Sequence, residues 1–137
     1  MMVLLGLALA SQAGCRTCTL MGYFDSVYVA FDGDLSRGGS YEVTLKEGPR
    51  TVGLCAFEVP ITSDQDLTCG SSMALDPTSD GTVRGVGMFW VPEDLRIAIT
   101  RDEEVLVDDV VNLEYTEDEP NGKGCGVRTT GEGTLSW

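Results

Sequence analysis

Apolar and polar residues alternate at every second position along much of this chain, and this pattern limits its fold more than any other feature. The clearest case is residues 40–46, where Tyr41, Val43 and Leu45 are separated by polar residues. Successive side chains of a β-strand point to opposite faces of a sheet, so the pattern predicts strands with one buried face. No 3.6-residue periodicity extends beyond two helical turns. The sequence therefore predicts an all-β fold.

The predicted strands are short and are separated by turn signals such as Glu47-Gly48-Pro49 and Pro92-Glu93-Asp94. Residues 51–59 are apolar on both faces, which predicts a central strand. Seven or eight strands at this spacing favour a two-sheet antiparallel β-sandwich, Ig-like in the loose sense, with a small barrel as the alternative. The strands span residues 26–32, 40–46, 51–59, 83–91, 95–100, 105–111 and 126–137, with a short one near 72–75. Their Val, Ile, Leu, Phe and Trp side chains form the predicted core.

The first residues have the composition of an export signal. Val3 to Ala10 is an uncharged apolar run, which suits a signal peptide but is shorter than the roughly 20 residues needed to span a bilayer. Small or polar residues follow it and lead directly to Cys15. The 137 residues leave room for one domain. We therefore expect a signal peptide over 1–14, a lipidated tether over 15–22 and a β-sandwich domain over 23–137.

Ala13-Gly14-Cys15, placed after an apolar run, resembles the lipobox of bacterial lipoproteins. In that family the cysteine is lipidated on sulfur and becomes the first residue of the mature chain. Gln12 stands where the family usually has Leu, and no Lys or Arg precedes the apolar run. The resemblance implies a membrane anchor on Cys15 and, with Arg16 rather than Asp next, sorting to the outer membrane. The alternatives are an ordinary secretory signal that leaves Cys15 as a thiol and a buried N-terminal strand.

The order of motifs beyond Cys15 is similar to that of a group of small predicted bacterial lipoproteins of unknown function. This resemblance implies a cell-envelope location and a sandwich fold, and it implies no activity. The shared features are Ala13-Gly14-Cys15, the early Cys18, Gly39-Ser40-Tyr41-Glu42-Val43-Thr44, Cys55, and Pro120-Asn121-Gly122-Lys123-Gly124-Cys125.

The number of cysteines is consistent with an exported protein. With Cys15 assigned to lipid, four remain, which in an exported domain predicts two disulfides with three possible connectivities. We favour Cys55–Cys69, which closes a loop between sequential strands, and Cys18–Cys125, which ties the N-terminal lead to the C-terminal segment. A zinc site is the alternative, but the chain has no C-x₂-C pair and no histidine to complete one.

Composition excludes several functional classes. The net charge of −13, from 22 acidic and 9 basic residues, argues against binding of nucleic acid or of an anionic membrane surface. The absence of histidine removes Ser-His-Asp and Cys-His catalysis and most catalytic zinc sites. We therefore expect neither an enzyme nor a cofactor, although paired carboxylates leave glycosidase chemistry as a remote alternative.

Acidic clusters raise the question of calcium. Asp32-Gly33-Asp34 begins like a calcium loop, but Arg37 stands where Gly is needed and Val43 where the bidentate Glu should be. Acids at 102–104, 108–109 and 117–119 would supply ligands if two loops met. We predict that these acids are solvated turn residues and that there is no metal site.

Aromatic residues suggest a second kind of site. Tyr23, Phe24 and Tyr28 lie near the first strand, and Phe89 and Trp90 lie in the fifth. They would form a glycan or peptide platform if exposed together, whereas core packing is the more common role of such residues.

These observations predict a membrane-anchored binding or structural module of the bacterial cell envelope, whose loops contact a protein or glycan partner. A secreted or periplasmic location is the alternative. The competing function is a secreted protease inhibitor or a hydrolase-associated domain. For an inhibitor, the disulfide-closed segment 60–70 is the candidate loop.

Overall fold

The computed structural model describes Cys18 and residues 22–137 of the chain. The predicted signal peptide, Cys15 and most of the predicted tether lie outside these residues. The described part contains ten strands and one short 3₁₀ helix. They are β1 (Ser26–Asp32), β2 (Gly39–Glu47), β3 (Arg50–Val59), η3 (Asp64–Asp66), β4 (Leu67–Cys69), β5 (Met73–Pro77), β6 (Val83–Met88), β7 (Leu95–Arg101), β8 (Glu104–Val110), β9 (Glu114–Asp118) and β10 (Arg128–Ser136).

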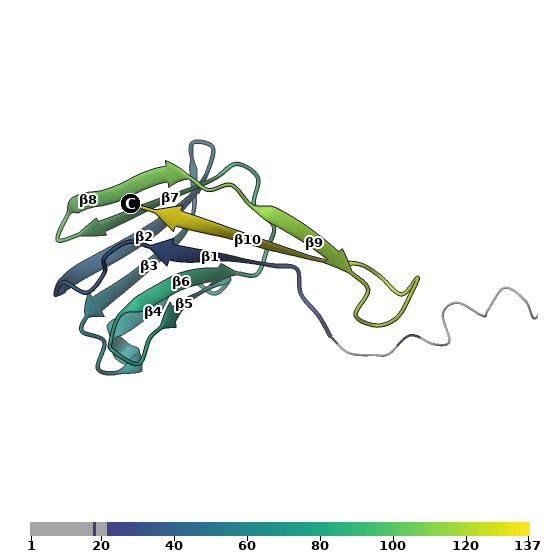
Figure 1. Ribbon diagram of the computed structural model, residues 1–137, viewed down its shortest axis with the longest axis horizontal. Helices are drawn as coiled ribbons and strands as arrows, with labels where there is room; N and C mark the ends of the chain where they lie inside the picture. Colours follow the sequence, from purple (N-terminus) through teal and green to yellow (C-terminus); the bar gives the residue numbers. More distant parts are fainter. Residues whose placement is uncertain (1–17, 19–21) are drawn as a thin grey trace, which may run out of the picture.

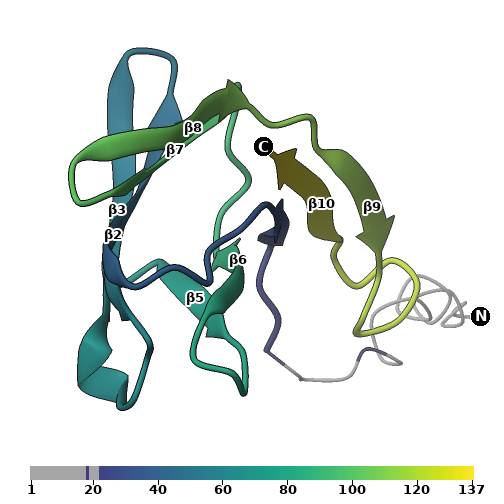
Figure 2. The same ribbon diagram turned by 60° about the vertical axis from the view of Figure 1, so that its left-hand side comes forward.

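The strands form two five-stranded sheets that pack face to face, as Figures 1 and 2 show. Sheet A has the order β5-β6-β1-β10-β9, and sheet B has the order β4-β3-β2-β7-β8. Every neighbouring pair is antiparallel except β1 and β10, which run parallel with Ser26 opposite Thr130. The predicted two-sheet β-sandwich is therefore confirmed. Within the described residues, no helix is long and apolar enough to cross a membrane.

The core lies between the two sheets and comes from the alternating positions. Tyr41 and Phe57 stack at the centre with their ring centroids 4.9 Å apart. Val27 and Val29 on β1 of sheet A are buried in the same core, as their spacing predicts. Each large apolar side chain that becomes fully buried contributes roughly 1.5–3 kcal/mol. The other fully buried side chains of the core are Val43, Leu45, Cys55, Val86, Met88, Leu95, Ile97 and Ile99.

The structure corrects the predicted number of strands, which is ten rather than seven or eight. The sequence prediction misses β4 and β9, and it assigns Glu117 and Asp118 to a loop although both belong to β9. All five residues of β9 are exposed, so the strand carries no alternation that would reveal it. It exists because its backbone pairs with β10.

Two predicted strands also differ in detail. β6 ends at Met88 rather than at residue 91, and the Phe89 side chain that follows is 54% exposed. The second face of β3 is not covered, because Leu54 is 50% exposed. β3 is therefore an interior strand of its sheet with only one buried face.

The sandwich has two opposite ends. The Cys18 end comprises Cys18, residues 22–25 and the β9–β10 loop (119–127), which lie together in Figure 1. The Trp137 end comprises the β1–β2 loop (33–38), the β7–β8 turn (102–103) and Trp137. Backbone hydrogen bonds join its parts, from Asp102 N–H to the Ser40 carbonyl (2.8 Å) and from Trp137 N–H to the Asp32 carbonyl (3.1 Å).

Candidate functional site

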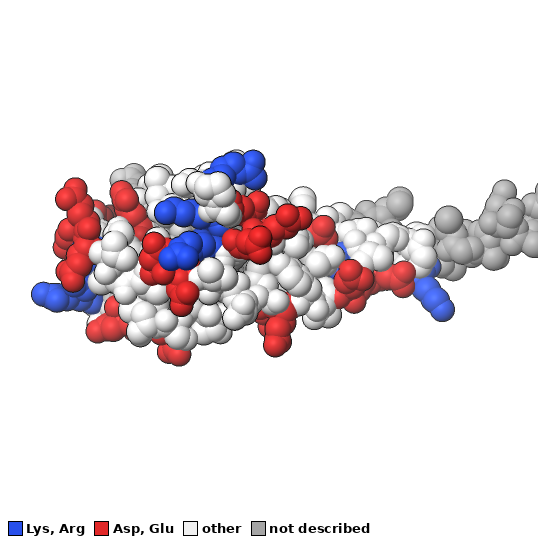
Figure 3. Space-filling model, turned by 90° about the horizontal axis from the view of Figure 1, so that it is seen from above, with Lys and Arg blue, Asp and Glu red and all other residues white. Residues whose placement is uncertain are grey.

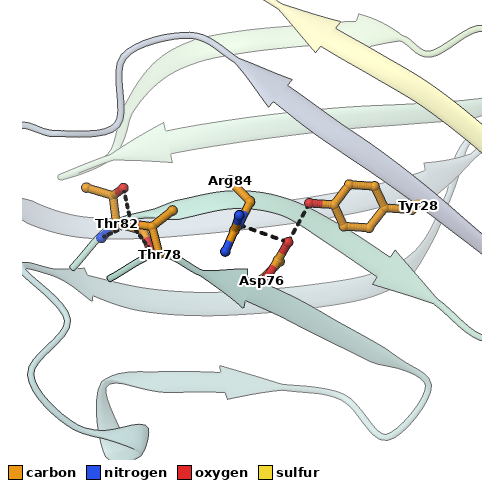
Figure 4. Close-up of polar contacts among 5 residues, drawn as sticks. All are labelled: Tyr28, Asp76, Thr78, Thr82 and Arg84. Atoms are coloured by element: carbon orange, nitrogen blue, oxygen red, sulfur yellow. Dashed lines mark hydrogen bonds and ion pairs between the residues drawn. The ribbon is translucent and has the colours of Figure 1, made fainter. Parts of the chain in front are cut away.

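The outer face of sheet A is built largely from small residues around one tyrosine. The strand register places Tyr28 of β1 beside Gly87, and Ala30 beside Gly85. The missing side chains on β6 leave room for the Tyr28 ring to lie across that strand. Its hydroxyl donates a hydrogen bond of 2.7 Å to the Asp76 carboxylate on β5, as Figure 4 shows.

Asp76 is shared between two partners. Besides accepting the hydrogen bond from Tyr28, it forms an ion pair of 3.2 Å with Arg84. Burial raises the pKa of Tyr28 to about 12, and the hydrogen bond to Asp76 and the negative charge of that carboxylate act in the same direction. Tyr28 is therefore a neutral hydrogen-bond donor at physiological pH, and its role in this group is structural.

The β5–β6 hairpin beside this group is closed by two threonines. The Thr78 N–H donates to the Thr82 carbonyl over 2.8 Å, and the two hydroxyl oxygens lie 2.9 Å apart. Figure 4 shows this pair next to Asp76 and Arg84. The polar side chains of this hairpin hold β5 and β6 together.

A shallow open depression of about 600 Å³ lies on the other half of the same face, beside Tyr28. Glu114 on β9 and Glu132 on β10 stand directly opposite each other in the register, and neither forms an ion pair with another described residue. Like charges directly opposite on neighbouring strands destabilise the pair. The sequence did not reveal this juxtaposition. The depression is lined by Tyr28, Ala30, Asn112, Glu114, Glu132, Gly133 and Thr134.

The acidic clusters proposed from the sequence do not gather at one place. Asp34 accepts hydrogen bonds from the Ser36 backbone and hydroxyl, which lower its pKa. Asp118 pairs with Arg128, and Asp108 pairs with Arg96, each at 2.6 Å. Among the described residues, no group of three or more acidic or cysteine side chains is arranged to hold a metal ion.

The segment between Pro60 and Gly70 is folded against sheet B. Cys55 and Cys69 face each other in the register of β3 and β4 and form a disulfide, as the sequence favoured. The Asp66 carboxylate accepts hydrogen bonds from the backbone N–H groups of Thr62 and Ser63, at 2.8 and 3.1 Å. These contacts hold η3 in a capping box at Ser63. The segment thus contains a helical turn and a paired strand.

The second disulfide lies at the Cys18 end. It joins Cys18 to Cys125, with 5.6 Å between the two Cα atoms, and this is the other favoured pairing. The loop that carries Cys125 is closed by a backbone hydrogen bond from Cys125 to Gly122 (3.0 Å), and the Glu119 carboxylate accepts the Gly124 N–H (3.1 Å). Across the sheet, Asp25 accepts the Thr129 N–H at 2.8 Å. The N-terminal lead is therefore fastened covalently to the loop before β10, and this hydrogen bond fastens it to β10 itself.

Of the five aromatic residues that the sequence singled out as a platform, the structure brings two into ring contact. Phe24 and Phe89 meet edge to face, with ring centroids 6.4 Å apart. Trp90 instead donates a hydrogen bond of 2.9 Å to Glu47, and Tyr28 lies across β6. Phe24 is 73% exposed, and Phe89 is 54% exposed.

Comparison of the chain with protein-family models, with curated proteins and with solved structures finds no match.

Proposed function

We propose that this protein is an extracytoplasmic lipoprotein of the bacterial cell envelope, in which lipid on Cys15 anchors a rigid β-sandwich that serves as a binding or structural module. The observation that carries this proposal is the Cys18–Cys125 disulfide, three residues after Cys15. Disulfides persist in oxidising compartments outside the cytoplasm. Two of them in one small domain support export.

The position of the disulfide limits how far a lipid anchor on Cys15 would let the domain move from the membrane. An extended chain covers at most about 3.6 Å per residue, so the link from Cys15 to Cys18 spans no more than about 11 Å. From Cys18 onward, the lead is bonded to the loop before β10. A lipid on Cys15 would therefore hold the Cys18 end of the sandwich within about 11 Å of the membrane surface.

The loops of the Trp137 end then point away from the anchor, which supports a binding role for them. They are held in place before any partner arrives: Asp34 closes the turn at Ser36, and the Asp102 carboxylate accepts the Ser40 N–H at 3.0 Å. Loops fixed in this way lose little conformational entropy on binding. A protein or glycan is the expected partner.

The geometry favours this proposal over a protease inhibitor. The candidate inhibitory segment is folded into η3 and β4 and pairs with β3. A loop that enters the cleft of a protease needs an extended backbone free to pair with the enzyme.

Intact mass spectrometry of the full-length protein, purified from membranes of a bacterial host, tests the proposal. We expect an N-terminus at Cys15 that carries a diacylglycerol, and recovery in the membrane fraction. The Cys15→Ser variant should be soluble outside the cytoplasm, with both disulfides intact. A mature protein with an unmodified Cys15 thiol would contradict the lipoprotein proposal and leave simple secretion.

A further inference from the structure

Phe24 and Phe89 form the most exposed aromatic contact of the described residues. Large aromatic side chains are usually buried, and they bury the most apolar area when they are covered. Here the two rings are 73% and 54% exposed. The Phe89 backbone is fixed by a hydrogen bond of 2.9 Å from its N–H to the Ser72 carbonyl. The pair is therefore a fixed apolar feature of the surface.

The strand directions explain why these residues meet near the anchored lead. Phe24 precedes β1 by two residues, and Phe89 directly follows β6, which is antiparallel to β1 with Val27 opposite Met88. A shallow depression that runs from Phe89 past Met88 to Gly131 continues the apolar surface.

The length of the lead places the membrane within reach of this surface. Phe24 lies six positions after Cys18, which corresponds to at most about 22 Å of extended chain. The link to Cys15 adds only about 11 Å. A surface attached by so short a tether meets the membrane at a high effective concentration, so even a weak contact is populated.

We infer that Phe24 and Phe89 form a membrane-contact patch on which the anchored module rests against the lipid surface. This inference rests on the proposed lipid anchor at Cys15. Aromatic and aliphatic side chains insert at the boundary between headgroups and acyl chains. The patch thus converts a point attachment into a defined orientation of the sandwich.

The charges near the patch indicate which lipids it meets. Asp25 adjoins Phe24, Glu132 lines the neighbouring depression, and the whole chain carries a charge of −13, while Arg128 at the start of β10 is paired with Asp118. Anionic headgroups would repel these carboxylates. The contact is therefore apolar, and it is stronger on zwitterionic lipid than on anionic lipid.

Hydroxyl-radical footprinting of the lipidated full-length protein in phosphatidylcholine vesicles tests the inference. The matched sample is the Cys15→Ser protein with the same vesicles. We expect oxidation of Phe24 and Phe89 to slow roughly threefold or more in the lipidated protein, because covered ring edges lose contact with water. Leu54 on the outer face of sheet B and Trp137 at the opposite end should be oxidised equally in both samples. Adding anionic phosphatidylglycerol should reduce the protection.

The outcomes separate this inference from the proposed function. Equal oxidation of Phe24 and Phe89 in the two samples, with lipid on Cys15 shown by mass, would overturn the inference alone and leave the patch open to a soluble partner. Protection that increases on anionic vesicles would also overturn it. Absence of lipid on Cys15 in the same mass spectrum would overturn the proposed function and, with it, the inference.

Discussion

Single residues decide how the outer face of sheet A is built, and glycine matters most there. Tyr28 crosses β6 only because Gly85 has no side chain. A Cβ atom at Gly85 would meet the Tyr28 ring and would lie 2.6 Å from the Val29 carbonyl oxygen, whereas a Cβ at Gly87 would find its nearest neighbour, the Ala74 carbonyl oxygen, at 3.8 Å. Two glycines on the same strand therefore have different structural roles.

Gly85→Ala is expected to destabilise the protein by about 1–3 kcal/mol, because the added methyl group forces Tyr28 off Asp76 or moves the backbone. Gly87→Ala is the matched control, and it should change stability by less than about 1 kcal/mol, since ordinary contact distances remain. Urea denaturation followed by circular dichroism measures both. Equal losses in the two variants would show that Tyr28 does not occupy this space.

The hydroxyl of Tyr28 should lose its proton only at high pH. Burial and Asp76 raise its pKa to about 12 in the folded state, against about 10 in the unfolded chain. The neutral form is therefore favoured by folding. This contribution to stability is fully present below pH 10 and is lost as the pH rises to about 12.

Absorbance at 295 nm after rapid pH jumps follows this titration, and the difference between the wild-type protein and Tyr28→Phe isolates it. In Asp76→Asn the pKa should move back towards 10, since that substitution removes the carboxylate acceptor and its charge. A difference spectrum with a midpoint near pH 10 in the wild-type protein would refute the assigned hydrogen bond.

At the scale of secondary-structure elements, the sequence reveals strands that bury one face and conceals those that do not. β1, β2 and β7 begin and end within about one residue of their predicted limits because each alternates buried and exposed side chains. β9 has no buried residue, and β4 has only three residues. Each of them forms because a neighbouring strand has a free edge with which it can pair. That neighbour is distant or unknown from the local sequence, so the local pattern does not reveal these strands.

β9 is also an edge strand of sheet A, and its composition suits an exposed edge. Its Glu114, Glu117 and Asp118 side chains are exposed, and charged residues on edge strands oppose pairing with a second chain. The arrangement lowers the stability of the β9–β10 pair, since Glu114 faces Glu132 across it.

Glu114→Lys should raise the free energy of unfolding by about 0.2–1 kcal/mol relative to Glu117→Lys, because it replaces a repulsive cross-strand pair with an attractive one. Glu117 faces Thr129 rather than an acid. Both substitutions change the net charge equally, so long-range effects cancel in the comparison. Thermal and urea unfolding measure the difference, and a lower stability for Glu114→Lys would contradict the register of β9 and β10.

For the whole molecule, the charge of −13 opposes the compact state. Figure 3 shows acidic side chains spread from one end of the molecule to the other on the face that it displays. Five ion pairs link described residues, and most of the side chains involved are substantially exposed. Exposed pairs contribute only about 0–1 kcal/mol each. Repulsion among the remaining acids should dominate the electrostatics of folding.

Added salt should therefore stabilise the protein. The Debye length falls from about 30 Å at 0.01 M to about 3 Å at 1 M ionic strength, so repulsion is largely screened. We expect the melting temperature to rise between 0.01 and 0.5 M NaCl. A gain of about 1 kcal/mol would appear as a rise of roughly 4 °C. A melting temperature that falls with NaCl would mean that ion pairs outweigh repulsion.

The fold class and the buried side of the principal strands can be read from the sequence alone, whereas the sequence only favoured the pairing of the cysteines among three connectivities. The strand class and the buried sides follow from local geometry, because the alternation of side-chain direction is built into every strand. The two favoured disulfides, Cys55–Cys69 and Cys18–Cys125, are the ones that the structure contains. Even the aromatic residues of the proposed membrane patch, Phe24 and Phe89, were visible as candidates.

Which of these residues meet depends on the tertiary structure. The parallel pairing of β1 with β10, the contact of Phe24 with Phe89 and the opposition of Glu114 and Glu132 all depend on which strands become neighbours. Tyr28 reaches Asp76, 48 positions away, because β6 lies between β1 and β5 with glycines at the crossing. Neighbour order is set by the packing of the whole core, so no local pattern in the chain encodes it.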